Sequence, residues 1–117
     1  MASNQLADVA DWLVRARHAV VLTGAGISTD SGIPDFRGPQ GVWTRDRKAE
    51  ALSDIRHYLA DAELRRRAWQ GRLNHPARGA TPNAGHLALA ELERMGRLQL
   101  LITQNIDGLH LGAGTSR

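Results

Sequence analysis

The sequence predicts an α/β fold in which a parallel sheet is connected by helical crossovers. Residues 19–23 and 98–103 are apolar runs of strand length. Residues 19–23 do not alternate between polar and apolar side chains, so this strand is expected to be buried on both faces, as in a parallel sheet, and residues 98–103 predict a second buried strand. Helical periodicity occurs between them. Because a minimal strand–helix–strand unit needs only about 30 residues, residues 27–97 are expected to do more than connect the strands.

The helices follow from periodicity and from capping residues. Apolar residues at spacings of three and four predict a helix over residues 4–17. Glycines and Pro34 interrupt residues 24–44, which predicts a loop with one short helix at 27–31. Residues 49–73 predict one or two helices, with Asp61 placed to cap the second, and residues 74–81 predict a loop. A further helix is expected with Thr81 as its cap, Pro82 in its first turn and Gly96 after its end.

Length and composition restrict the class of protein. The chain has 117 residues, of which 42% are apolar and 23% charged, an ordinary composition for one globular domain. No apolar run approaches the roughly 20 residues that cross a bilayer, and the N-terminus lacks the apolar core of a signal peptide. We therefore expect a cytoplasmic protein without a membrane partner.

The charged and sulfur-containing residues exclude some sites. The absence of cysteine excludes disulfides and thiolate zinc sites within these residues. The formal net charge is only +3 and the basic residues are almost all arginine, with Lys48 the sole lysine. This usage favours a bacterial source over a nucleic-acid partner, and we expect a monomer.

A glycine turn follows the first strand directly. Gly24, Ala25 and Gly26 can bring bare backbone N–H groups against a phosphate. The dinucleotide fingerprint would have a third glycine at position 29, where this chain has Thr29, and no lysine follows as in the P-loop of an NTPase. A phosphate-binding turn and a tight strand-to-helix turn without a ligand both remain open.

The loop after Pro34 carries three side chains that packing does not explain. Asp35, Phe36 and Arg37 place an acid, an aromatic ring and a guanidinium side by side. Arg37 suits bidentate contact with a phosphate or carboxylate, and Asp35 suits a sugar hydroxyl. The alternative is a surface turn with an Asp35–Arg37 ion pair.

The second strand also runs into polar residues. Gln104, Asn105 and Asp107 surround Ile106 at the carboxyl end of that strand, the edge at which open α/β sheets bind ligands. An amide beside a carboxylate suits recognition of a carboxamide. The alternative is an Asx turn that caps the next helix.

Three motifs together resemble the sirtuin family of NAD-dependent protein deacylases: residues 24–28, 31–37 and 103–110, in family order and at family-like spacing. Residues 39–44 are similar to the branch that includes nuclear chromatin deacylases and many bacterial relatives. The resemblance implies a partial Rossmann-like sheet with a mobile cofactor-binding loop. It also implies NAD as cofactor, an acyl-lysine protein as substrate, and transfer of the acyl group to ADP-ribose with release of nicotinamide.

The resemblance assigns roles to individual residues. Gly24, Ala25 and Gly26 would hold the NAD pyrophosphate. Ser28, Asn105 and Asp107 would line the nicotinamide pocket, Phe36 would shield the reactive ribose carbon, and Arg37 and Gln104 would contact the phosphate and ribose region. The implied cofactor-binding set is Gly24, Ala25, Gly26, Ser28, Asp35, Phe36, Arg37, Trp43, Gln104, Asn105, Ile106 and Asp107.

Other family parts have no match in these residues. The resemblance places the general-base histidine and the four zinc-binding cysteines beyond Arg117, so residues 1–117 would be the N-terminal part of one catalytic domain, with no catalytic residue and no deacylation on their own. His86 and His110 are expected to pack rather than react. Two alternatives remain: a non-catalytic module that binds NAD or ADP-ribose, and a sirtuin-like protein ADP-ribosyltransferase.

Overall fold

The computed structural model describes residues 2–116, with side chains described from residue 4 onward. The chain divides into two compact units. Unit 1 consists of Met1–Gly24 and Pro82–Arg117, and unit 2 of Ala25–Thr81.

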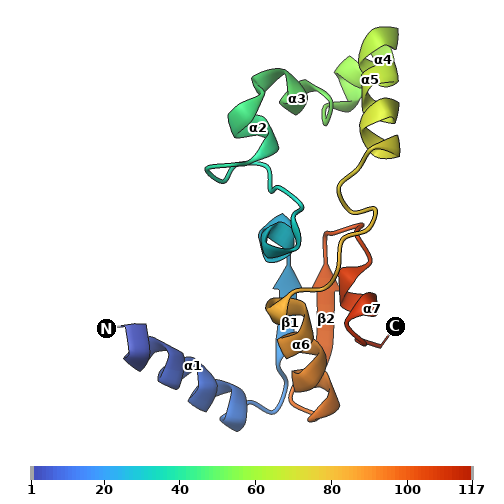
Figure 1. Cartoon of the computed structure of the whole chain (residues 1–117). Coiled ribbons are helices and arrows are strands. Elements are labelled where there is room, and N and C mark those ends of the chain that lie inside the picture. The colour runs from blue at the N-terminus through green and yellow to red at the C-terminus, as the bar shows by residue number, and fades with distance from the viewer. Residues whose placement is uncertain (1, 117) are drawn as a thin grey trace. The chain divides into compact units, whose positions relative to one another are not determined.

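Unit 1 is built on a parallel pair of strands (Figure 1). Strand β1 (Val20–Thr23) pairs with strand β2 (Leu100–Thr103), with Val20 opposite Leu100 and Thr23 opposite Thr103. Both strands lie within the apolar runs, and their parallel pairing is confirmed. Because the pair is parallel and in register, both strands end at the same edge, so residues 24 and 104 leave the sheet side by side.

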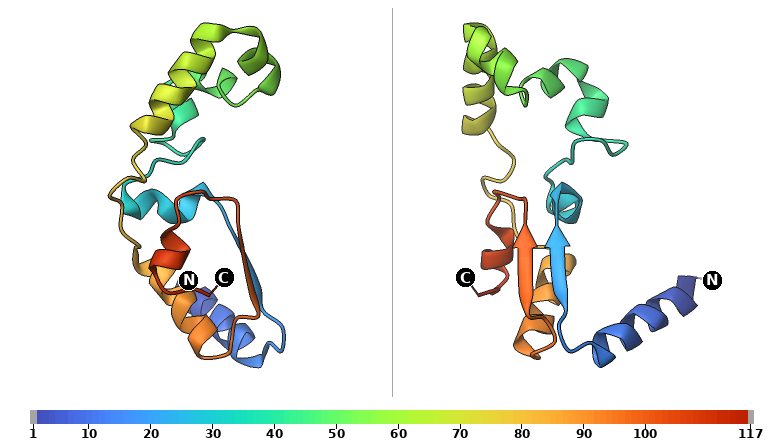
Figure 2. Two further views of the ribbon diagram at one scale, coloured as in Figure 1. Left: turned by 90° about the vertical axis from the view of Figure 1, so that its right-hand side faces the viewer. Right: turned by 180° about the vertical axis from the view of Figure 1, so that it is seen from behind.

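One face of this sheet is covered by helices of the same unit. Helices α6 (Ala84–Arg94) and α7 (Leu109–Gly112) lie on one side of the strands, and the opposite face is open when seen from behind (Figure 2). Alternate strand residues point to opposite faces, so the four side chains on the open face are 47% to 65% exposed: Val20, Leu22, Leu100 and Ile102. The prediction that both faces of each strand are buried is therefore wrong for this chain.

Helix α1 (Ala2–Arg15) starts and ends two residues earlier than predicted. Its end is tied to the rest of unit 1 by Arg97, whose Nη1 donates to the carbonyl of Val14 at 2.8 Å. No helix in the described part of the chain is both long enough and apolar enough to span a membrane.

The start of α6 corrects one predicted cap. The side chain of Asn83, not of Thr81, accepts a hydrogen bond from Gly85 N at 2.9 Å. His86 Nδ1 in turn accepts from the backbone N–H of Asn83 at 3.1 Å, which completes a capping box. At the other end, Gly96 adopts a left-handed φ of 70° just after the helix, as predicted.

Unit 2 is helical. The 3₁₀ helix η1 (Ala25–Ser31) is followed by α2 (Val42–Arg45), α3 (Arg47–Ala51), α4 (Ile55–Ala60) and α5 (Ala62–Leu73). An aspartate caps each of the last three helices: Asp46, Asp54 and Asp61. The predicted cap at Asp61 is confirmed. Residues 49–73 hold more helices than predicted because Asp54 caps an additional one.

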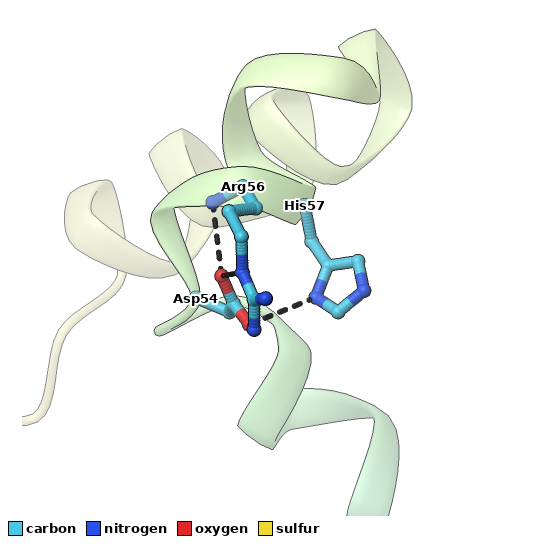
Figure 3. A network of polar contacts seen from close by, with 3 residues as sticks. All are labelled: Asp54, Arg56 and His57. Atoms are coloured by element: carbon cyan, nitrogen blue, oxygen red, sulfur yellow. Dashed lines mark hydrogen bonds and ion pairs between the residues drawn. The ribbon is translucent and has the colours of Figure 1, made fainter.

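The cap at Asp54 is reinforced by two basic side chains (Figure 3). Asp54 accepts from the backbone N–H of Arg56 and from its Nη2, each at 2.9 Å, while His57 Nδ1 lies 3.5 Å from Oδ2. The side-chain hydrogen bonds of Arg56, followed by its backbone N–H, lower the pKa of Asp54 from 3.8 to about 2. This carboxylate therefore stays charged, and the cap stays intact, well into the acid range.

Candidate functional site

The turn after β1 contains two glycines that this chain does not need for its own packing. A Cβ at Gly24 would meet Gln104 Nε2 at 3.8 Å, an ordinary contact, and a Cβ at Gly26 would meet no atom within 4 Å. Neither residue has a positive φ. The described structure leaves the space beside this backbone open, as the close approach of a pyrophosphate requires.

The loop after β2 is hydrogen-bonded to the end of β1 and to the glycine turn. Gln104 N donates to Thr23 O at 3.1 Å and so prolongs the strand pairing by one bond. Asn105 Nδ2 donates to Gly24 O at 2.8 Å, and the backbone N–H of Asn105 donates to Thr103 Oγ1 at 3.1 Å. Unit 1 thus brings together predicted site residues that are 81 positions apart in the sequence.

The next two residues of this loop differ in their surroundings. Asp107 Oδ1 accepts from Leu109 N at 3.0 Å and so forms an Asx turn ahead of α7, but the N-cap residue of that helix is Gly108. Gly108, between them, has a φ of 73°, a conformation that favours glycine. The side chain of Ile106 is 92% exposed, so an apolar group stands at the carboxyl edge of the sheet, available to a ligand.

Two histidines are buried next to this edge. His110 is 5% exposed, with Nε2 2.8 Å from Thr23 Oγ1. The ring of His86 is fully buried and packs edge-on against the ring of His110, with 4.9 Å between the ring centroids. Burial, and secondly the proximity of His86, lower the pKa of His110 from 6.5, although Asp107 acts in the opposite direction. His110 is therefore held neutral.

In unit 2, hydrogen bonds within residues 35–43 close the loop that contains Asp35. Asp35 Oδ1 accepts from Gly38 N at 2.9 Å, and Val42 N and Trp43 N donate to the carbonyls of Asp35 and Phe36 at 2.7 and 2.9 Å. A Cβ on Gly41 would lie 2.5 Å from Phe36 O, so only glycine fits there. The structure shows no Asp35–Arg37 ion pair, so that alternative is wrong.

Trp43 organises the side chains of the same loop. Its ring lies 4.9 Å from the ring of Phe36, at an interplanar angle of 43°, and Arg37 Cζ lies 4.8 Å above it. Phe36 remains 46% exposed. The indole thus holds an aromatic ring and a guanidinium at the surface of unit 2, where both can reach a ligand.

The start of unit 2 contains the remaining predicted residues, Ala25, Gly26 and Ser28, within η1. Ser28 is 1% exposed, and Thr29 Oγ1 closes the turn by donating to Gly26 O at 2.9 Å. A hollow of about 510 Å³, large enough for part of a small ligand, adjoins this helix. It is lined by Thr29, Gly32, Pro34, Asp35, Pro39, Gln40 and Arg45.

The predicted site residues therefore fall into two groups. Gly24, Gln104, Asn105, Ile106 and Asp107 belong to unit 1, and the other seven to unit 2. Sequence reasoning missed Thr23 and Thr103, whose hydroxyls are hydrogen-bonded to each other at 2.9 Å. A signal was available, because each threonine is the last residue of its apolar run. Among the described residues, no group of three or more His, Asp and Glu side chains could hold a metal ion.

Comparison with known proteins identifies the family. The family model described as Sir2 family matches residues 24–117. The chain belongs to the Sir2 family. This Sir2 chain is 54% identical over 96 residues to NAD-dependent protein deacetylase 2 of Streptomyces coelicolor, covering 82% of the chain and 40% of that protein. It is 48% identical over 110 residues to NAD-dependent protein deacylase 2 of Pyrobaculum aerophilum, covering 92% and 43%.

Solved structures of Sir2 proteins support the same family assignment. A Sir2 variant with a deacetylated p53 peptide and 3′-O-acetyl ADP-ribose matches with a TM-score of 0.82 and 39% identity, over 96% of this chain and 44% of the other. Sir2 bound to an acetylated peptide matches with a TM-score of 0.73 and 37% identity, over 96% and 42%. The fold is thus the Rossmann-like fold of Sir2 proteins. This chain spans about two fifths of the length of the curated relatives described above.

Proposed function

We propose that these residues form the cofactor-binding part of an NAD-dependent protein lysine deacylase. The observation that carries the proposal is the bond from Asn105 Nδ2 to Gly24 O, at 2.8 Å. It joins a glycine turn to an amide- and carboxylate-bearing loop at the carboxyl edge of a parallel sheet, where nucleotides bind. The names of the relatives, protein deacetylase and deacylase, support the same activity.

Each group of residues has a defined task in this proposal. When bound, NAD supplies a ribose carbon from which nicotinamide can leave, so that the acyl group passes from lysine to ADP-ribose. The backbone N–H groups of residues 24–26 bind the pyrophosphate. Asn105 and Asp107, with Ser28, orient the carboxamide, and Phe36 excludes water from the reactive carbon. Arg37 and Gln104 contact the phosphate and ribose region.

We further propose that deacylation needs residues other than these 117. None of the histidines in this chain matches the family's general base, and a positioned base contributes roughly 10²–10⁴-fold in rate. An acyl-lysine protein as substrate and zinc in another part of the same domain complete the proposal. The arginine-rich composition supports a bacterial source without a nucleic-acid partner, and the proposal includes a cytoplasmic monomer without a membrane partner.

Calorimetry with NAD tests the binding proposal, and Gly26 offers a sharp variant. Gly26→Ala has room within the chain, so it should preserve the fold while its methyl group obstructs the pyrophosphate. We expect NAD affinity to fall at least tenfold. Gly71→Ala is the matched control, because a Cβ there also meets no atom within 4 Å. No NAD binding, or equal affinity in Gly26→Ala, would contradict the proposal.

A turnover assay tests the second part. The 117-residue chain, incubated with NAD and an acetyl-lysine peptide, is expected to release no nicotinamide above background. Measurable NAD-dependent deacylation would refute the requirement for other residues. Transfer of label from the ADP-ribose part of NAD to protein would instead favour the ADP-ribosyltransferase alternative.

A further inference from the structure

A continuous series of hydrogen bonds runs from the buried His110 to the glycine turn. Nε2 of His110 lies 2.8 Å from Thr23 Oγ1, which donates to Thr103 Oγ1 at 2.9 Å. Thr103 Oγ1 accepts the backbone N–H of Asn105 at 3.1 Å, and the side chain of Asn105 donates to Gly24 O at 2.8 Å. Every link lies within unit 1, at the carboxyl ends of β1 and β2.

The surroundings of the two ring nitrogens decide which of them carries the proton. Nε2 lies 2.8 Å from Thr23 Oγ1, and a hydroxyl can either donate or accept a hydrogen bond there. The other nitrogen, Nδ1, is buried and has no hydrogen-bond partner among the described residues. An unpaired buried acceptor costs less than an unpaired buried N–H, so the neutral Nε2–H form fits this environment.

We propose that His110 is a positioning residue for the cofactor edge, defined as the carboxyl edge of the sheet with Gly24 and residues 104–107. Its Nε2–H holds Thr23, and through Thr103 it fixes residues 104–107 against Gly24. This role rests on the proposed function only in that the positioned loop is the one expected to bind NAD. Protonation of Nδ1 would introduce a buried N–H without an acceptor, beside His86 of α6 and the Asp107 carboxylate that precedes α7.

The opposite end of the sheet contains a matched control. His18 Nδ1 lies 2.8 Å from Gln99 Oε1, so a second histidine joins the chain just before β1 to the chain just before β2. This pair is exposed and lies at the amino ends of the strands. Loss of His18 should therefore loosen that end alone, where Gln99 N donates to Ala19 O at 2.9 Å.

Amide hydrogen exchange in the 117-residue chain separates the two ends. The probe at the cofactor edge is Gln104 N–H, which donates to Thr23 O, and the probe at the other end is Gln99 N–H. His110→Leu should speed exchange of Gln104 at least tenfold and leave Gln99 unchanged, while His18→Leu should do the reverse. His110→Gln, whose side-chain amide can donate to Thr23, should restore slow exchange at Gln104.

A second variant guards against loss of folding in His110→Leu. Thr103→Val keeps the branched shape and leaves the His110–Thr23 contact in place, but it removes the link to Asn105. It should speed exchange of Gln104 several-fold. The ¹⁵N shifts of His110 should show a protonated Nε2 and a bare Nδ1. Unchanged exchange in both variants, fast exchange at Gln104 in the unsubstituted chain, or a proton on Nδ1 would overturn the inference.

Calorimetry with NAD then connects this network to the ligand. NAD should bind at least tenfold more weakly to His110→Leu than to His18→Leu, with recovery in His110→Gln. If His110→Leu changed the exchange of Gln104 but bound NAD as tightly as His18→Leu, His110 would order only the backbone around it. Its link to the cofactor would then be refuted. Absence of NAD binding in the unsubstituted chain would count against the proposed function, whereas the exchange result still decides the positioning role.

Discussion

The carboxylate of Asp35 lies against the backbone of Gly38 and accepts its N–H at 2.9 Å. A Cβ on residue 38 would collide with that carboxylate. The two residues therefore depend on each other: glycine at 38 leaves the space that the acid at 35 needs to close the turn.

The first prediction concerns this turn. Asp35→Ala removes the acceptor for Gly38 N–H, and a typical hydrogen bond contributes about 1 kcal/mol. Exchange of the Gly38 amide should therefore speed up about fivefold. Asp35→Asn retains an oxygen at the same place and should keep most of the protection. Equal exchange in Asp35→Ala and the unsubstituted chain would show that the turn closes without the side chain.

The second prediction concerns the indole of Trp43. Trp43→Ala removes the ring that contacts both Phe36 and Arg37, and such contacts are each worth about 1 kcal/mol. NAD affinity measured by calorimetry should fall roughly tenfold. Trp69→Ala is the control, because Trp69 stacks with Arg72 at the same 4.8 Å but in α5. Comparable losses in the two variants would point to general destabilisation.

The third prediction concerns pH. The pKa of His110 is lowered from 6.5 in the folded chain, so between the two pKa values the unfolded chain binds the proton and the folded chain does not. The contribution of His110 to the free energy of unfolding should therefore be fully present above about pH 7.5 and decrease as the pH falls below about 6.5. Urea denaturation across this range measures the slope. His110→Gln should flatten it, and a slope unchanged by this substitution would assign it to other groups.

The fourth prediction concerns Asp54. Its pKa of about 2 is due first to the side chain of Arg56, so Arg56→Gln should raise the pKa toward 3.8 while the backbone N–H of residue 56 still donates. Because the folded pKa is depressed, this cap contributes stability above about pH 4 and loses it as the pH falls toward 2. Carbon-13 NMR of the Asp54 carboxyl measures both values. A pKa near 2 in Arg56→Gln would assign the shift to the backbone.

Local sequence patterns predicted where the helices and strands lie better than they predicted which side chains are buried. The apolar runs correctly indicated β1 and β2, but a two-stranded sheet with helices on one side leaves Leu22 and Ile102 exposed, which no local pattern reveals. Asn83 replaced Thr81 as a cap because the ring of His86 reaches back to the Asn83 amide. That contact depends on the position of a buried ring.

The candidate site was predictable in its residue types but not in its hydrogen bonds. Asp107 and Asn105 stood out as polar residues after a strand, yet their partners, Leu109 N and Gly24 O, depend on how the loop turns at Gly108. Thr23 and Thr103 were counted as strand residues, because a single hydroxyl at the end of an apolar run carries no periodic signal. Their pairing appears only once the strands are in register.

The pairing of Thr23 with Thr103 also bears on the order of folding. These residues are 80 positions apart, whereas Arg65 reaches the Tyr58 carbonyl across only 7. Closing a long segment costs entropy before any contact offsets it, and distant pairings form slowly. The helices of unit 2 can therefore form before β1 pairs with β2. During synthesis, β1 leaves the ribosome with an unpaired edge, and the pairing of Thr23 with Thr103 can form only after β2 has been made.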